Sequence, residues 1–320
     1  MYHFSYRVYQ RPFRRPLRTH HGWWECREGI ILRLAGESGR VGWGEIAPIA
    51  WFGSETLEEA VSFCREIGNS IAEAAILSIP DSLPACQFGF ESALEDTRSN
   101  GALDESSPNY SYLLPNGQEA LDTLPEVLKN TSIDTFKWKI GVSPLETESA
   151  IAEKLTRQLP DGAKLRLDAN GGLTLSDARV WLTLADELSN LEFIEQPLPP
   201  RQFGEMLSLG ESFRTPIALD ESVCNLQQVE SCYREGWRGV FVIKPSIMGS
   251  IRRFREVWNR YPVDAVFSSA LESSIGRRSA LRLAVECSRN DRALGFGVGQ
   301  WFADGIDRET EWLETLWKTS

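Results

Sequence analysis

Short apolar stretches alternate with amphipathic stretches along the last two thirds of the chain. The apolar stretches are typical of buried strands, and the stretches between them carry apolar residues at helical spacing. Strands that alternate with helices run parallel, because each helix carries the chain back across the sheet. The pattern predicts helices at Thr147–Gln158, Leu175–Glu187 and Leu226–Glu235, and strands at Tyr110–Leu114, Phe136–Ile140, Leu165–Asp168, Phe193–Glu195, Ile217–Asp220, Val240–Lys244, Ala265–Ser268 and Ala293–Gly297.

Eight such units predict an α/β fold in which the strands close into a TIM-like (β/α) barrel, here over residues 106–299. An open, doubly wound sheet is the structural alternative. The glycine-rich phosphate loops G-x-G-x-x-G and G-x-x-x-x-G-K-[ST], which would favour the open sheet, follow none of these strands.

The first hundred residues have a different pattern, in which strands are followed by helices. This order predicts an N-terminal α+β capping domain over residues 1–105, which we expect the C-terminal segment 300–320 to join. The predicted elements are strands at Glu28–Leu34 and Arg40–Glu45 joined by a turn at Gly36–Gly39, a helix at Leu57–Ile79 capped by Ser54 or Thr56, and a helix at Ala85–Arg98.

Composition narrows the possible partners. The net charge of -11 argues against nucleic acid and against an anionic membrane surface, since both require a basic face. A small anionic substrate stays compatible, because a metal ion and a few lysines can reverse the charge of one pocket.

The expected location is a reducing cytoplasm. Met1–Arg18 is interrupted by arginines and prolines and does not resemble a signal peptide. No stretch approaches the roughly 20 apolar residues of a membrane span. The six cysteines include no C-x-x-C pair, which argues against a zinc ribbon or a thioredoxin-like site. Nothing in the pattern indicates an oligomeric state.

Charged residues end five successive predicted strands. Lys139, Asp168, Glu195, Asp220 and Lys244 follow one another at steps of 29, 27, 25 and 24 residues, each about one strand-helix unit. The carboxyl ends of barrel strands are where active sites form. Each residue alone has an ordinary explanation, such as a solvated lysine, a helix cap or an ion-pair partner. All five charges occupy the same place, the carboxyl end, on five successive strands, and coincidence does not explain that arrangement.

The three carboxylates predict a magnesium site. Asp168, Glu195 and Asp220 offer only hard oxygen ligands, which suit Mg²⁺. Zinc is disfavoured because the three histidines, His3, His20 and His21, all lie in the N-terminal region. Glu221, next to Asp220, is interpreted as a helix cap or as support for the metal ligands.

The lysines predict acid–base chemistry. Lys137 and Lys139 point to the same side of a strand, and two neighbouring ammonium groups beside a dication lower each other's pKa. One of them can then act as a base, with Lys244 on the opposite side of the ring. A small-molecule carboxylate bound between Lys139 and Lys244 would lose the proton next to its carboxylate, and the metal would stabilise the resulting anion.

These residues sit in motifs that resemble the enolase superfamily and, within it, the o-succinylbenzoate synthase family. The resemblance runs from about Arg11 to Gly305. The Lys-x-Lys pair and the three carboxylates mark the superfamily broadly, whereas Lys-Pro and Ser-Ser-x-x-Glu-Ser favour the synthases. The matching segments are FKWKIG (136–141), LRLDANGG (165–172), FIEQPL (193–198), ALDES (218–222), VIKPSIMGS (242–250), SSALESSIG (268–276), HGWWECREGIILRL (21–34) and GWGEIAP (42–48).

The resemblance implies an enolase-type barrel and a Mg²⁺-dependent lyase, with Mn²⁺ as the alternative ion. The reaction would be syn dehydration of 2-succinyl-6-hydroxy-2,4-cyclohexadiene-1-carboxylate to 2-succinylbenzoate, in menaquinone or phylloquinone biosynthesis. Lys139 would be the base and then the acid, and Lys244 would stabilise the anionic intermediate through a cation–π contact. The implied metal ligands are Asp168, Glu195 and Asp220, and the implied substrate-binding residues are Lys137, Arg166, Asn170, Ser268, Ser269 and Gly297.

Two further expectations concern selectivity. The aromatic segments Arg18–Trp24 and Ile49–Ser54 of the capping domain are expected to close over an apolar substrate ring, or to form core between the domains. An N-acylamino acid racemase, a dipeptide epimerase or a cycloisomerase would use the same catalytic residues. A non-catalytic binding barrel would be expected to have lost some of them.

Overall fold

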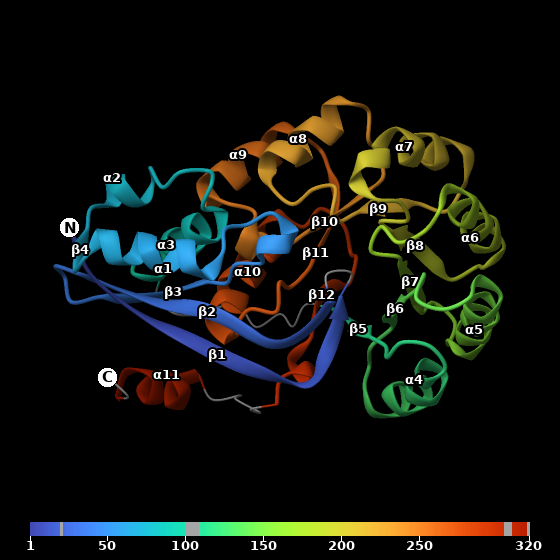
Figure 1. The fold of residues 1–320 in the computed structure, drawn as a ribbon, viewed down its shortest axis with the longest axis horizontal. Helices are drawn as coiled ribbons and strands as arrows, with labels where there is room; N and C mark the ends of the chain where they lie inside the picture. The colour runs from blue at the N-terminus through green and yellow to red at the C-terminus, as the bar shows by residue number, and fades with distance from the viewer. Residues whose placement is uncertain (20–21, 100–108, 304–308, 319–320) are drawn as a thin grey trace.

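The computed structural model describes residues 1–19, 22–99, 109–303 and 309–318. Figure 1 shows two parts, a capping part built on an antiparallel sheet at the left and a parallel barrel at the right. The predicted domain boundary between residues 105 and 106 lies outside the described residues, as do His20 and His21. Among the described residues, no helix is both long and apolar enough to cross a membrane.

The barrel forms as the apolar pattern predicts. Its strands follow one another around the sheet in chain order from β5 to β11, and β12 joins beside β5. A parallel bridge between Ser268 and Gly295 links the two ends of the sheet, so the barrel is closed. The strands are β5 (Tyr110–Leu113), β6 (Thr135–Lys139), β7 (Lys164–Asp168), β8 (Leu191–Glu195), β9 (Ile217–Leu219), β10 (Val240–Ile243), β11 (Asp264–Phe267) and β12 (Leu294–Gly297).

Helices cover the outside of this barrel. Outward-pointing strand residues such as Phe136 and Trp138 are fully buried beneath them, while Lys137 and Lys139 alternate to the inner face of β6. The predicted barrel is therefore confirmed, with each strand boundary within two residues of the prediction. The helices are α4 (Glu119–Asn130), α5 (Leu145–Gln158), α6 (Leu175–Glu187), α7 (Phe203–Ser212), α8 (Leu226–Arg234), α9 (Ile251–Arg260) and α10 (Ser274–Cys287).

The capping part contains a long hairpin that the sequence pattern did not predict. Strand β1 covers Tyr2–Thr19 and pairs along almost its whole length with β2 (Gly22–Gly36). Its arginines and prolines obscured the alternation that buries Tyr9, Arg11 and Phe13 on one face, while Phe4 is buried on the other. A register shift between Pro12 and Leu17 accommodates the prolines.

The other capping elements were predicted better. Strand β3 (Val41–Ile46) follows the predicted glycine turn, and β4 (Ser70–Ile71) pairs with the far side of β1. Thr56 caps helix α1 through a capping box with Glu59. The single helix predicted over Leu57–Ile79 is wrong, because Gly68 adopts a φ of +73° and ends α1. The helical elements are η1 (Ala50–Phe52), α1 (Leu57–Ile67), α2 (Glu73–Ile76) and α3 (Pro84–Asp96).

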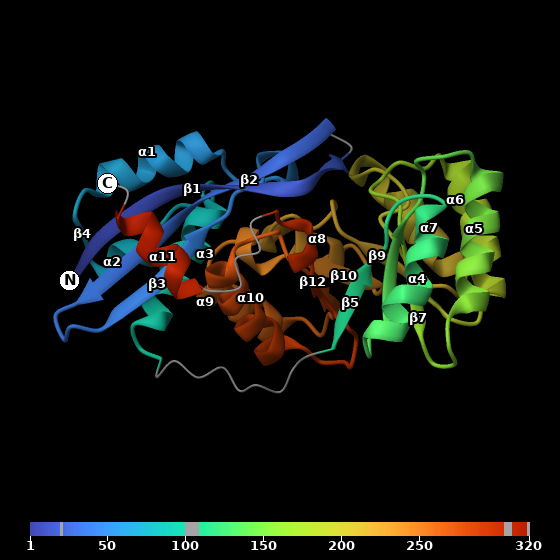
Figure 2. The ribbon, with the colours of Figure 1, turned by 90° about the horizontal axis from the view of Figure 1, so that it is seen from below.

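The last helix, α11 (Glu309–Lys318), lies along the capping sheet rather than on the barrel, as Figures 1 and 2 both show. Trp312 packs edge-on against Tyr9 with ring centroids 5.4 Å apart, and Trp317 packs against Trp43 at 5.0 Å. Edge-to-face pairs of this kind stabilise a contact beyond the area they bury.

A buried carboxylate joins the two parts. Glu45 at the end of β3 has no exposed surface, and it accepts hydrogen bonds from the backbone N–H groups of Ser273 (2.9 Å) and Gly276 (2.9 Å) at the start of α10. Tyr9 donates its hydroxyl to the same carboxylate at 2.5 Å. A negative charge at a helix N-terminus is favourable, and it fixes the cap on the barrel beside the loop after β11.

Candidate active site

The predicted ring of charges forms at the carboxyl ends of the barrel strands. Lys139 is paired in register with Asp168, and Asp168 with Glu195 on the next strand. Asp220 follows the end of β9 and Lys244 follows the end of β10. The three carboxylate residues are each at most 7% exposed, so the ring lies at the bottom of the barrel mouth rather than on the surface.

Lys137 bridges two of these carboxylates. Its Nζ lies 2.8 Å from Asp168 Oδ2 and 2.7 Å from Glu195 Oε1. Burial alone would lower the pKa of Lys137, but the charges of Asp168 and Glu195 raise it above its ordinary value. The carboxylates therefore outweigh the effect expected of a neighbouring ammonium, and Lys137 is their electrostatic partner. A lowered lysine pKa beside a bound dication stays a prediction.

With Glu221 included, the ring has one more carboxylate than lysine: Asp168, Glu195, Asp220 and Glu221 face Lys137, Lys139 and Lys244. Burial and the neighbouring Asp168 raise the pKa of Glu195 to about 8. Burial and Glu221 raise the pKa of Asp220 to about 6, although Lys244 forms an ion pair with it. Asp168 differs, because Lys137 overcomes the effect of burial and lowers its pKa. Crowded carboxylates with raised pKa values are the environment that a bound cation would relieve.

An oxygen without a partner supports the same conclusion. Glu221 accepts a hydrogen bond from Asn170 Nδ2 at 3.2 Å through Oε1, whereas its buried Oε2 has no partner among the described residues. The cap of α8 is Asn225, which accepts from the backbone N–H of Gln228, so the interpretation of Glu221 as a helix cap is wrong.

The donor set fits Mg²⁺, since it consists of carboxylate oxygens, and the nearby Oε2 of Glu221 has no hydrogen-bond partner among the described residues. In the described residues, no three histidine, cysteine or carboxylate side chains form a closed cluster for a metal ion. The ammonium of Lys137 instead lies between Asp168 and Glu195.

Gln196 is an organising residue that the residue-by-residue prediction missed. It is fully buried with a φ of +39°. Its side-chain oxygen, Oε1, accepts a hydrogen bond from the backbone N–H of Asp220 at 2.9 Å. Its side-chain nitrogen, Nε2, donates a hydrogen bond to Ser222 Oγ at 2.7 Å. Gln196 thereby fixes Asp220 relative to the neighbouring strand end, which bears Glu195. Its place beside Glu195 in the FIEQPL segment was the available indication.

Arg166 points inward as predicted, but it lies below the ring. Its Nε donates to Glu192 Oε2 at 2.6 Å, and its Nη1 donates to the carbonyl of Ala293 at 2.8 Å. Its guanidinium also lies over Phe193, 5.0 Å from the ring centroid. These contacts make Arg166 part of a buried ion pair, and a contact with substrate stays a prediction.

The predicted donors on the last two strands have other partners. Ser269 donates its hydroxyl to Glu272 at 2.9 Å, and Ser268 donates to the carbonyl of Gly295 at 3.4 Å. A side chain at Gly297 would place Cβ 2.5 Å from the carbonyl oxygen of Ser111, so glycine is required there by close packing. Their part in substrate binding stays a prediction.

The capping segment Ile49–Ser54 reaches the ring. Phe52 places its ring centroid 4.0 Å from the Nζ of Lys244, while the neighbouring Trp51 is 41% exposed. The segment therefore contacts a predicted catalytic residue directly, in addition to packing between the capping part and the barrel.

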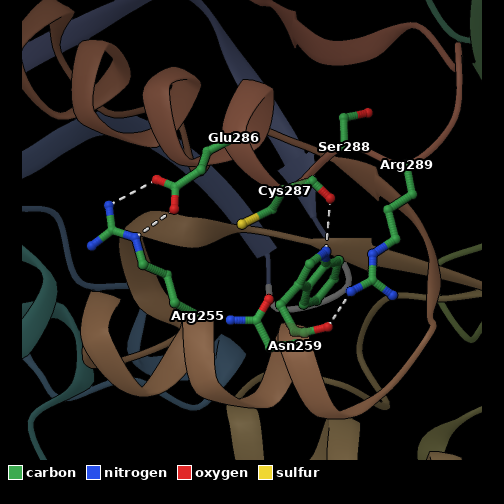
Figure 3. Close-up of a pocket in the computed structure, with 7 residues that line it drawn as sticks. Arg255, Asn259, Glu286, Cys287, Ser288 and Arg289 are labelled. Atoms are coloured by element: carbon green, nitrogen blue, oxygen red, sulfur yellow. Dashed lines mark hydrogen bonds and ion pairs between the residues drawn. The ribbon is translucent and has the colours of Figure 1, made fainter.

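A separate surface hollow, shown in Figure 3, lies between α9 and α10. Its polar groups pair with one another: Arg255 with Glu286, and Trp258 Nε1 with the carbonyl of Cys287. Its lining includes none of the ring residues, and its charges are satisfied, so the ring is the candidate active site.

Comparison with known proteins agrees with this geometry. Residues 119–296 match the family model described as enolase C-terminal domain-like, and residues 4–97 match the model described as MenC, N-terminal domain. An o-succinylbenzoate synthase from Thermosynechococcus vestitus is 40% identical over 98% of both chains. The chain belongs to the o-succinylbenzoate synthase family. A second family member, from Pasteurella multocida, is 31% identical over 82% of this chain and 80% of its own length.

Solved structures extend the comparison. The crystal structure of o-succinylbenzoate synthase from Thermosynechococcus elongatus, described with Mg in the active site, superposes with a TM-score of 0.90. It is 39% identical and covers 99% of this chain and 100% of its own. An L-Ala-D/L-Glu epimerase from Bacillus subtilis has a TM-score of 0.80 at 22% identity, covering 95% of this chain and 91% of its own, which shows the shared fold alone.

Proposed function

We propose that the protein is a Mg²⁺-dependent o-succinylbenzoate synthase. It would convert 2-succinyl-6-hydroxy-2,4-cyclohexadiene-1-carboxylate to 2-succinylbenzoate and water, a step of menaquinone or phylloquinone biosynthesis. The observation that carries the proposal is the ring in which Lys139 and Lys244 flank three buried carboxylates, in a chain 40% identical to a synthase over its whole length.

Asp168, Glu195 and Asp220 would hold Mg²⁺, with Mn²⁺ as the alternative ion. The ion, when bound, stabilises the negative charge that develops on the substrate carboxylate. Lys137 would add its positive charge beside Asp168 and Glu195, which its ammonium contacts at 2.8 and 2.7 Å.

Lys139 would perform both proton transfers. As a neutral amine it takes the proton from the carbon that bears the carboxylate, and the C–H electron pair becomes part of the new double bond. As an ammonium it then protonates the leaving hydroxyl, so that the C–O bond breaks and water departs. Because one group serves both steps, proton and hydroxyl leave from the same face of the ring, which makes the elimination syn.

Lys244 would stay protonated and stabilise the anionic intermediate from the opposite side. Asn170 would support the metal ligands through Glu221, with Ser268, Ser269, Gly297 and Arg166 as candidates for contact with the succinyl group. We further propose a cytoplasmic location, and a division into a capping domain (1–105, joined by 300–320) and a catalytic domain (106–299).

A spectrophotometric assay tests the proposal. Pure protein with Mg²⁺ should convert the cyclohexadiene to the benzoate, with growing benzoate absorbance, and removal of the ion by EDTA should stop the reaction until Mg²⁺ is restored. No growth in the presence of Mg²⁺ would refute the synthase proposal. Exchange of the α-proton of N-acylamino acids or dipeptides in D₂O, without dehydration, would instead assign a racemase or an epimerase.

A further inference from the structure

The capping part contacts the candidate active site through one aromatic ring. Phe52 in η1 places its ring centroid 4.0 Å from Lys244 Nζ, and the Asp220 carboxylate engages the same ammonium as an ion pair. The side chain of Lys244 is only 13% exposed. An ammonium withdrawn from water gains more from the face of an aromatic ring than an exposed one does.

The backbone around Phe52 is held rigidly. Its N–H donates to the carbonyl of Ile49 at 2.9 Å, and the N–H of Ile49 donates to Ser54 Oγ at 2.7 Å. Gly53 has a φ of +97°, and a Cβ there would lie 3.2 Å from the Cβ of Cys224 in the loop after β9. The turn therefore packs closely against the barrel loop after β9, beside the ring of charges.

A buried arginine anchors the start of this turn. Arg27 is 2% exposed, and its guanidinium donates to the carbonyl of Pro48 at 2.7 Å and also to that of Ala47. The same guanidinium lies over Trp24, 5.5 Å from the ring centroid. Trp24 in turn packs edge-on against Trp51 at 4.9 Å. The residue before Phe52 is thus fixed by strand β2 of the cap.

We propose that Phe52 is a positioning residue for Lys244, which makes the capping part a contributor to catalysis as well as a cover over the pocket. The face of its ring and the carboxylate of Asp220 hold the ammonium in one place. The inference rests on the proposed function, because it takes Lys244 as the group that faces the anionic intermediate. An ammonium that is already held in place loses less freedom when the intermediate forms.

The contact itself can be measured without activity. The chain has seven lysines, so a protein labelled with ¹³C-lysine gives few ε-CH₂ signals, and Lys244→Ala identifies the one from Lys244. That signal should be shifted upfield by the ring of Phe52 in the wild type and in Phe52→Tyr, which keeps the aromatic face. It should move to the ordinary position in Phe52→Leu, which keeps the apolar bulk. An unshifted wild-type signal, which requires no variant to fold, overturns the proposal.

Kinetics then separate positioning from other roles. We expect Phe52→Leu to lower kcat about tenfold, equivalent to about 1.4 kcal/mol, with little change in KM, and Phe52→Tyr to restore most of the loss. In a Lys244→Ala background, Phe52→Leu should cause almost no further loss, because its effect passes through the missing ammonium.

Three kinetic outcomes overturn the proposal: an unchanged kcat, a rise in KM alone, which would mean that the ring contacts substrate, and a rise in kcat/KM, which would mean that it blocks the pocket. A wild-type protein that fails to dehydrate the substrate refutes the proposed function instead. In that case, the position of the Lys244 signal still reports whether the contact exists.

Discussion

The barrel contains two buried charge clusters, one at each end of its strands, and they are built differently. The lower cluster joins Arg166 to Glu192 at 2.6 Å and Arg292 to both Glu192 (2.7 Å) and Asp264 (2.8 Å). Although burial works against it, Arg166 and Arg292 hold the pKa of Glu192 below its usual value. In this cluster two arginines pair with two carboxylates, so the charges balance, although the buried Nη2 of Arg166 has no hydrogen-bond partner among the described residues.

The upper cluster is the ring of the candidate active site, and it is not balanced. Burial and Asp168 raise the pKa of Glu195 to about 8, and Glu221 has a buried oxygen with no partner among the described residues. Its cations are lysines, whose protonation can change, whereas the lower cluster uses arginines, which stay charged. The contrast indicates that a charge-balanced cluster of arginines and carboxylates maintains the fold, while a cluster with excess carboxylates and titratable lysines is prepared to bind a cation and move a proton.

The largest expected effect is the loss of turnover when the upper cluster loses its base. Lys139→Ala should lower kcat by about 10² to 10⁴, the range that general acid–base catalysis contributes. The change removes one amine beside the carboxylates without opening a cavity in the apolar core, so the fold should survive. The dehydration assay measures the first effect and urea unfolding measures the second.

Lys164→Ala is the matched control, because Lys164 is exposed at the start of β7, the neighbouring strand. It should leave kcat unchanged. If Lys139→Ala were as active as this control, Lys139 could not be the base, and the contrast between the two clusters would lose its functional meaning.

The next effect concerns the lower cluster and stability. Glu192→Gln leaves the guanidinium of Arg166 buried without its counter-charge, and breaking a buried pair on one side costs about 3–5 kcal/mol. We expect the free energy of unfolding, measured with urea, to fall by roughly that amount. Glu153→Gln, which breaks the exposed pair with Arg157, is the control and should cost about 0.5 kcal/mol or less.

The same variant predicts a change in pH dependence. Because the pKa of Glu192 is lower in the folded protein than in the unfolded chain, its ion pairs stabilise the fold above the ordinary carboxyl pKa. That contribution is lost as the pH falls through the folded pKa. The wild type should therefore lose more stability than Glu192→Gln on acidification. Parallel stability curves for the two proteins would show that the lower cluster is not the source of this dependence.

The sequence predicted best those features that a regular local pattern determines. In the barrel, alternation of apolar strands and amphipathic helices determines the architecture, and charges at the carboxyl ends of successive strands gather at its mouth. The sequence alone therefore places Lys139, Asp168, Glu195, Asp220 and Lys244 on one ring. The comparisons support the family but do not test the role of each residue.

The features that sequence patterns missed depend on contacts between distant segments. Strand β1 has too many arginines and prolines to look like a strand, and it forms because β2 pairs with it. The partners of Arg166, Glu192 and Ala293, come from distant segments, so the motif around Arg166 does not reveal them. The contact of Phe52 with Lys244 joins positions 192 residues apart, and no local pattern encodes it.

The smallest effect tests whether the upper cluster extends beyond its three carboxylates. Asn170 has a φ of +44° and donates to Glu221, so its backbone and its side chain can be tested separately. Asn170→Gly accepts that φ and removes only the side chain, and we expect about tenfold weaker Mg²⁺ affinity with little change in stability, as for other partners of metal ligands. Asn170→Ala should lose the same affinity and be ~1 kcal/mol less stable than Asn170→Gly, because alanine keeps a Cβ at positive φ without the polar side chain that lets asparagine adopt this conformation. Titrating the melting temperature with Mg²⁺ measures both quantities. An Asn170→Gly protein that binds Mg²⁺ as tightly as the wild type would confine the ion's environment to Asp168, Glu195 and Asp220.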